Sequence, residues 1–84
     1  MEWKETKNQL SATFTFVDFA EAFGFMTEVA FHAERCNHHP DWKNSWNKVE
    51  IVLTTHDAGN VVTEKDHNLA AIITKVYHKY SQKE

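Results

Sequence analysis

The stretch Val49-Glu50-Ile51-Val52-Leu53-Thr54 decides the fold, because its residues alternate over the length of one strand. The alternation predicts a strand with Val49, Ile51 and Leu53 facing a core. Residues 9–16 alternate in the same way and predict a second strand. The inward positions of that strand are Leu10, Ala12, Phe14 and Phe16. Lys7-Asn8 stands before it and suits a tight turn from a first, shorter strand.

Two further segments predict helices. Asp18 and Glu21 stand in a capping-box relation, and Pro40 restricts the residue before it, so we expect the first helix to run from Asp18 to about Asn37. Its predicted apolar stripe consists of Phe19, Phe23, Met26, Ala30 and Ala33. Three more residues widen the apolar surface on another side: Phe25, Val29 and His32. So wide an apolar surface predicts burial on more than one face, including against another subunit.

The rest of the chain completes the pattern. Trp42–Ser45 predicts a short strand and Asn47-Lys48 a turn, while Thr63–Asp66 has the composition of a helix start. The apolar face of the second helix is predicted at Leu69, Ile72, Ile73, Val76, Tyr77 and Tyr80. The order strand, strand, helix, strand, strand, helix predicts an α+β fold: a four-stranded antiparallel sheet with two helices packed on one face. Residues 1–84 then form a single domain.

Composition excludes several classes of protein. The 84 residues carry a formal net charge of −3, which is no electrostatic footprint for nucleic acid. There is no apolar run long enough to span a membrane and no signal-peptide core at the N-terminus. The single cysteine, Cys36, rules out an intrachain disulfide and favours a reducing compartment. We therefore expect a cytoplasmic protein that binds neither nucleic acid nor membrane.

The chemically distinctive residues are histidines. His38-His39-Pro40 forms a loop after the first helix, and His56 follows the strand of residues 49–54. Imidazole changes its protonation state near neutral pH. If both segments reach the same end of the sheet, three imidazoles converge and can move protons to and from a polar heterocycle. Polar neighbours of this cluster are Glu34, Asn37 and Asp66.

Other interpretations of the same residues remain open. The histidines could be solvated loop residues, or three of them with a carboxylate could bind zinc. The chain has neither a helical i, i+4 ligand pair nor a His-x-His strand pair at this place, which favours acid/base chemistry over a metal site. Trp42 and Trp46 are both candidates for the wall of a pocket that holds a flat ring, and Trp46 is the better of the two. Cys36 is interpreted as a small buried residue and not as a nucleophile.

The spacing of Glu34, His38-His39-Pro40, Trp46, His56 and Asp66 resembles the signature of the pterin-4a-carbinolamine dehydratases. The resemblance covers roughly residues 3–73. It implies the α+β sandwich described above, assembled as a homodimer or homotetramer, with no metal and no organic cofactor. The implied reaction removes water from 4a-hydroxytetrahydrobiopterin and gives the quinonoid dihydropterin.

The resemblance also implies roles for individual residues. The acid/base residues would be His38, His39 and His56. The residues that line the substrate site would be Asn37, Thr54, Thr55 and Asp57. Glu34 and Asp66 would be supporting carboxylates of the same site. Trp46 is added to this substrate-binding set as the pocket wall. The family commonly has a helix before the first strand, whereas this chain begins almost at that strand, so we expect part of the sheet or a subunit contact to be uncovered. The loop after His56 is one residue longer than the commonest form, which we expect to change the loop and not the chemistry.

A second class of function stays open. Proteins resembling this family partner transcription factors or assist the assembly of other enzymes. Such a binding or assembly module could keep the histidines and act through its helix surface. Retention of every signature position favours the dehydratase.

Overall fold

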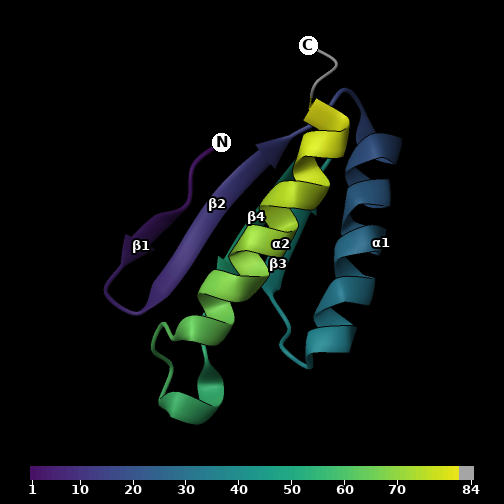
Figure 1. The fold of residues 1–84 in the computed structure, drawn as a ribbon. Coiled ribbons are helices and arrows are strands. Elements are labelled where there is room, and N and C mark those ends of the chain that lie inside the picture. The colour runs from purple at the N-terminus through teal and green to yellow at the C-terminus, as the bar shows by residue number, and fades with distance from the viewer. Residues whose placement is uncertain (82–84) are drawn as a thin grey trace.

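The computed structural model describes residues 1–81 as one sheet and two long helices (Figure 1). The elements, in chain order, are β1 (Lys4–Thr6), β2 (Gln9–Thr15), α1 (Phe19–Cys36), β3 (Asp41–Ser45), β4 (Lys48–Leu53), the short 3-10 helix η1 (His56–Ala58) and α2 (Glu64–Ser81). This order confirms the predicted strand and helix pattern. Among the local differences, the β3–β4 turn lies at Trp46-Asn47, one residue earlier than predicted.

The four strands form an antiparallel sheet in the order β1-β2-β4-β3, and both helices cover the same face (Figure 1). The two alternating segments that predicted strands, β2 and β4, are the central pair. Ala12 lies opposite Ile51 and Phe14 opposite Val49, so their inward side chains form one apolar surface beneath the helices. The fold class predicted from the sequence is confirmed.

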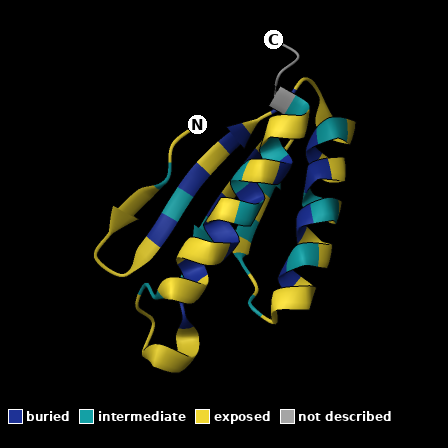
Figure 2. Ribbon diagram, viewed as in Figure 1, coloured by how far each residue is buried: buried dark blue, intermediate teal, exposed yellow. Residues whose placement is uncertain are grey.

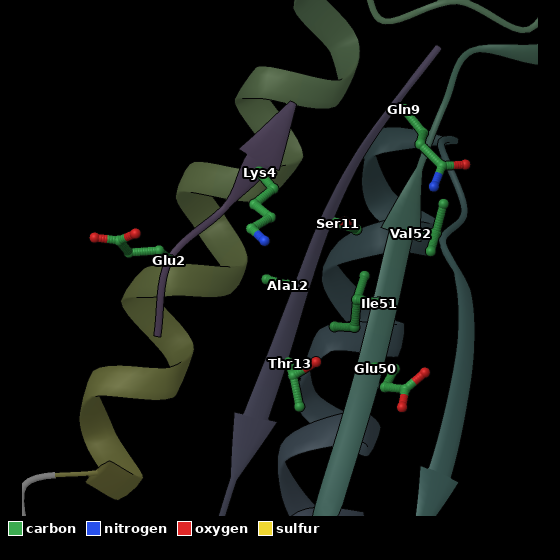
Figure 3. Close-up of a pocket in the computed structure, with 9 residues that line it drawn as sticks. All are labelled: Glu2, Lys4, Gln9, Ser11, Ala12, Thr13, Glu50, Ile51 and Val52. Atoms are coloured by element: carbon green, nitrogen blue, oxygen red, sulfur yellow. The ribbon is translucent and has the colours of Figure 1, made fainter. Parts of the chain in front are cut away.

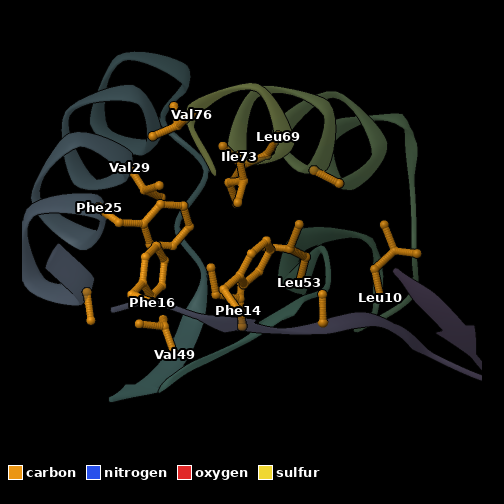
Figure 4. Close-up of a cluster of buried hydrophobic side chains, with 14 residues drawn as sticks. Leu10, Phe14, Phe16, Phe25, Val29, Val49, Leu53, Leu69, Ile73 and Val76 are labelled. Atoms are coloured by element: carbon orange, nitrogen blue, oxygen red, sulfur yellow. The ribbon is translucent and has the colours of Figure 1, made fainter. Parts of the chain in front are cut away.

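The core is centred on Phe14, which is completely buried (Figure 4). Its ring centroid lies 5.2 Å from that of Phe25 on α1 and 5.0 Å from that of Tyr77 on α2. Aromatic pairs at these distances add to the stabilisation that burial alone provides. Phe14 therefore joins the sheet to both helices at once.

The predicted apolar stripe of α1 is wrong at three of its positions. Phe19, Phe23 and Ala30 are exposed. The buried face instead consists of Ala22, Phe25, Val29 and Ala33. Helical periodicity reveals that α1 has two apolar faces, but it does not say which one meets the sheet. The buried face points toward α2 and the strands, and the exposed one toward the outer side (Figure 2).

Both ends of α1 are capped, and the cap at the N-terminal end is the one that the sequence predicts. Asp18 accepts a hydrogen bond from the backbone N–H of Glu21 at 2.8 Å, and the Glu21 carboxylate accepts one from the N–H of Val17 at 3.2 Å. At the other end Asn37 adopts a left-handed conformation with φ 53°, and its N–H donates to carbonyls of the last turn. This turn directs the chain out of the helix into His38.

The second helix packs through its predicted face. Leu69, Ile73 and Val76 are buried, and Ile72, Tyr77 and Tyr80 are half-buried. Lys79 and Tyr80 both donate to the carboxylate of Glu28 on α1, and the Lys79 hydrogen bond is the main cause that lowers the pKa of Glu28. Within residues 1–81, neither helix has the combination of length and apolar character that crossing a bilayer requires.

Replacing Phe14 by alanine tests this description of the core. We expect Phe14→Ala to lower the free energy of unfolding by about 3–5 kcal/mol, because it leaves a cavity between the sheet and both helices. Thr13→Ala, on the uncovered face of the same strand, is the matched control and should change stability by less than about 0.5 kcal/mol. Urea denaturation measures both, and equal losses for the two variants would contradict the proposed core.

Candidate active site

The two histidine segments meet at one end of the molecule. The C-terminus of α1 brings Asn37, His38 and His39 to the end of the sheet where β3 begins, and β4 leaves the sheet at that end toward His56 (Figure 1). A shallow hollow of about 170 Å³ lies between them. Its lining consists of Asn37, His38, His39, Thr55, His56, Asp57 and Lys65. All three histidines predicted to act together do border the same hollow.

A buried carboxylate stands behind His38. Asp66, in the first turn of α2, is completely buried, and its Oδ1 lies 2.6 Å from Nε2 of His38. A carboxylate only accepts hydrogen bonds, so Nε2 of His38 carries a proton and donates it to this bond. In the neutral ring Nδ1 is then unprotonated, and it makes no hydrogen bond to any other residue of the described range 1–81. Asp66 thus fixes which nitrogen of His38 is available to a substrate.

The remaining oxygen of Asp66 is fully satisfied as well. Oδ2 accepts from the hydroxyl of Thr55 at 2.7 Å and from the N–H of Thr63 at 2.9 Å. The Thr55 hydroxyl uses its proton in that bond, so the Thr63 hydroxyl, 2.6 Å away, donates to Thr55. Burial alone would raise the pKa of Asp66, but the hydrogen bonds from His38, Thr55 and Thr63 outweigh burial and lower it. Asp66 is therefore a charged, positioning group.

The other two histidines are more exposed. Nδ1 of His56 lies 2.7 Å from Oδ1 of Asn60, in a turn where Asn60 itself has a left-handed φ of 61°. Donation from Nδ1 to that oxygen leaves Nε2 of His56 available. Nε2 of His39 lies 3.1 Å from Oε1 of Glu34, and both side chains are mostly exposed. These two rings can rotate more easily than that of His38.

Two predicted site residues lie elsewhere. Trp46 occupies the β3–β4 turn, at the opposite end of both strands from the histidines, and is 66% exposed. The hydroxyl of Thr54 donates to the carbonyl of Asn8 in the β1–β2 turn and does not border the hollow. The Thr54 prediction came from the family resemblance. The Trp46 prediction treated closeness in sequence as closeness in space. A strand instead carries its two ends apart by about 3.3 Å per residue.

One lining residue was missed by the sequence analysis. Lys65 borders the hollow from the first turn of α2, directly before Asp66. Its side chain places a positive charge beside the histidines and Asp57. Its position next to the helix cap was the available clue, because Asp66 must point inward to accept its hydrogen bonds and the preceding residue then faces outward.

Within the described residues 1–81, neither a group of metal ligands nor a larger hollow on the sheet offers a better site. Within residues 1–81, no three His, Cys, Asp or Glu side chains are grouped as ligands for a metal ion. A larger hollow of about 480 Å³ lies on the uncovered face of the sheet, over β2 and β4 (Figure 3). It is lined by Glu2, Lys4, Gln9, Ser11, Ala12, Thr13, Glu50, Ile51 and Val52. Because it contains no histidine, it offers no group that exchanges protons near neutral pH.

Comparison with known proteins identifies the family of the chain. A family model described as "Pterin 4 alpha carbinolamine dehydratase" matches residues 1–76. The chain therefore belongs to the pterin-4-alpha-carbinolamine dehydratase family. It is 50% identical over 76 residues to a "Putative pterin-4-alpha-carbinolamine dehydratase" of Rhodopseudomonas palustris, covering 88% of this chain and 74% of that protein. It is 52% identical over 60 residues to a protein of the same description from Rhizorhabdus wittichii, covering 71% and 62%.

Solved structures share the fold. The structure of a transcriptional coactivator/pterin dehydratase from Brucella melitensis superposes with a TM-score of 0.85 at 38% identity, covering 89% of this chain and 81% of the other. A pterin dehydratase-like protein described as a RuBisCO assembly factor of the alpha-carboxysome gives a TM-score of 0.77, covering 92% and 90%. At 24% identity, this second likeness concerns the fold alone.

The ionised state of Asp66 has a measurable consequence for stability. Its pKa in the folded protein lies below the unfolded value of about 3.9, so its stabilisation is complete above that value and is lost as the pH falls through the folded pKa. At neutral pH we expect Asp66→Asn to cost about 1–3 kcal/mol, because a buried acceptor network is broken. Thermal denaturation from pH 7 down to pH 3 measures the difference from wild type. A difference that grows on acidification would contradict the assignment.

Proposed function

We propose that this protein catalyses the loss of water from 4a-hydroxytetrahydrobiopterin by histidine acid/base chemistry, as a metal-free carbon–oxygen lyase. The observation that carries the proposal is the 2.6 Å contact between buried Asp66 and His38 at the edge of a hollow that two further histidines border. Family membership and the predicted signature support the same reaction. Asp66 acts as a positioning residue and the histidines as the reacting groups.

The reaction needs two proton transfers. A base removes the proton from the ring nitrogen next to C4a, and the electron pair of that N–H bond forms the C=N bond of the quinonoid product. The C4a–O bond breaks, and an acid delivers a proton to the departing oxygen, so that water leaves. The proton removed and the proton delivered balance, which explains why no cofactor is required.

We assign the base to His38. Its Nε2–H is held by Asp66, so the neutral ring presents Nδ1 as a proton acceptor, and the adjacent carboxylate stabilises the imidazolium that forms. The acid is then one of the two more exposed histidines, His39 or His56.

The hollow fits only the reacting part of a pterin. Small-molecule sites commonly have volumes of about 300–1,000 Å³, whereas this hollow has about 170 Å³. Asn37, Asp57 and Lys65 supply polar groups at its rim. We infer that these groups bind the polar edge of the ring, and that the side chain of the biopterin stays outside the hollow. Cys36 is exposed, so the prediction that it is buried was wrong. As a free thiol it is consistent with a reducing, cytoplasmic setting for this chemistry.

Removing the site histidines tests the reaction. We expect His38→Ala and His56→Ala each to lower kcat for dehydration of synthetic 4a-hydroxytetrahydrobiopterin by about 10²–10⁴-fold. His78→Ala, on the exposed side of α2, is the matched control and should retain wild-type activity. Stopped-flow absorbance follows the dehydration, and circular dichroism verifies folding. Wild-type protein that turns over no faster than the uncatalysed reaction would refute the proposal.

A chelator separates the acid/base mechanism from a metal mechanism. Because the proposed proton transfers use only side chains, we expect dialysis against EDTA to leave both kcat and the melting temperature unchanged. Elemental analysis of the purified protein provides the parallel measurement. Loss of activity on chelation, restored by added zinc, would show that the histidines act as ligands instead.

A non-catalytic binding or assembly module is the alternative. The observation that favours it is the exposed apolar side of α1, which no part of the described chain covers. Solved relatives are described as a transcriptional coactivator/pterin dehydratase and as a RuBisCO assembly factor. A pull-down from cell extract with wild type and His38→Ala distinguishes the functions. A specific partner that binds both proteins, together with no dehydratase activity of the wild type, would support the binding or assembly module.

A further inference from the structure

The loop after His56 gives the ring of that histidine a hydrogen-bond partner. Nδ1 of His56 lies 2.7 Å from Oδ1 of Asn60, four residues further along the chain. Nε2 of His56 has no hydrogen-bond partner within residues 1–81, and the ring borders the hollow. Asn60 is not among the lining residues of the hollow, so its effect on a substrate there would pass through His56.

Backbone hydrogen bonds fix the place of Asn60 independently of its side chain. Its N–H donates to the carbonyl of Thr55 at 3.0 Å, and the N–H of Thr55 donates to the carbonyl of Val61 at 2.9 Å. Asn60 has a φ of 61°, in the left-handed region that asparagine and glycine tolerate well. Thr55 is in turn anchored to buried Asp66 through its hydroxyl. The loop therefore presents the Asn60 amide to His56 from a hydrogen-bonded backbone.

We propose that Asn60 is a positioning residue for the dehydration: its side-chain oxygen accepts the Nδ1 proton of His56 and directs Nε2 toward the substrate. The inference rests on the proposed function for its reaction, whereas the hydrogen bond itself can be measured without substrate. An amide oxygen only accepts, so the contact selects the Nδ1–H form of the neutral ring. Asp66 selects the opposite tautomer of His38.

Opposite tautomers suit two histidines that move protons in opposite directions. In the proposed reaction His38 accepts the proton of the ring nitrogen at Nδ1. Protonated His56 delivers its Nε2 proton to the departing oxygen, the electron pair of the C4a–O bond stays on that oxygen, and water leaves. The neutral ring of His56 then carries its proton on Nδ1, which is the form that Asn60 binds. The acid therefore needs no rotation during the step.

The third histidine of the hollow has weaker support. Nε2 of His39 lies 3.1 Å from Oε1 of Glu34, whose long side chain is 82% exposed, and an ion pair of this kind holds a geometry poorly. The contact at His56 is exposed as well, but its acceptor is a short side chain on a hydrogen-bonded turn. Of the two candidates for the acid, His56 is therefore the preorganised one. On this proposal the loop after His56 contributes to the chemistry, contrary to the expectation from the sequence.

Two substitutions of Asn60 test its role. Asn60→Gly suits the left-handed backbone and removes only the side chain. We expect it to lower kcat about three- to tenfold, which corresponds to one exposed hydrogen bond, and to change KM less than about twofold. Asn60→Asp keeps an acceptor and removes the donor, so it should keep the Nδ1–H form and a higher kcat than Asn60→Gly. Asn68→Ala removes an amide from the exposed side of α2 and should behave like wild type.

Nitrogen-15 NMR at a pH where His56 is neutral measures its tautomer, with His56→Ala to assign the signal. Stopped-flow absorbance measures kcat, and circular dichroism verifies folding. Wild type and Asn60→Asp should show His56 protonated at Nδ1, and Asn60→Gly a mixture of tautomers.

A wild-type His56 protonated at Nε2 would overturn the proposal, because the amide would then be the donor. An unchanged kcat in Asn60→Gly would overturn it as well. A wild type without dehydratase activity would refute the reaction and with it the catalytic role of Asn60, while the NMR measurement would still decide whether Asn60 orients His56.

Discussion

The buried carboxylate of Asp66 is the interaction on which the site depends. A charge without solvent must be compensated by hydrogen bonds, because its desolvation costs several kcal/mol. Its partners come from three parts of the chain: the loop after α1, the end of β4 and the residue before α2. The same bonds that satisfy the charge therefore begin α2, anchor Thr55 and orient His38. In the proposed function, stability and chemistry share one group at this end of the sheet.

The sheet topology explains why this group can gather such partners. Strands β3 and β4 pair antiparallel, so the start of β3 and the end of β4 lie at the same end of the sheet. The segment before β3 carries His38 and His39, and the segment after β4 carries Thr55 and His56. The apolar contact of Phe14 with both helices then holds α1 and α2 over that sheet. The pairing of β3 with β4 therefore brings the histidine segments together, and the core holds both helices in place beside them.

Much of this arrangement was predictable from the sequence, for identifiable reasons. Alternation identified β2 and β4, and capping residues identified the start of each helix. The convergence of the histidines followed from placing His56 at a strand end. The feature that the sequence could not predict is the direction in which a helix faces. Helical periodicity did not say which apolar face of α1 meets the sheet. The predicted strands at 42–45 and 49–54, with a turn between them, did imply that Trp46 lies at the far end of a hairpin, and the pocket prediction overlooked this.

The tautomer of His38 tests the account most directly. Nitrogen-15 NMR of the imidazole ring at neutral pH distinguishes a ring protonated at Nε2 from one protonated at Nδ1. The account predicts that neutral His38 is held in the Nε2–H form by Asp66, and that Asp66→Asn converts it to a mixture of tautomers. A neutral His38 protonated at Nδ1 in the wild-type protein would contradict the assignment of that nitrogen as the proton acceptor.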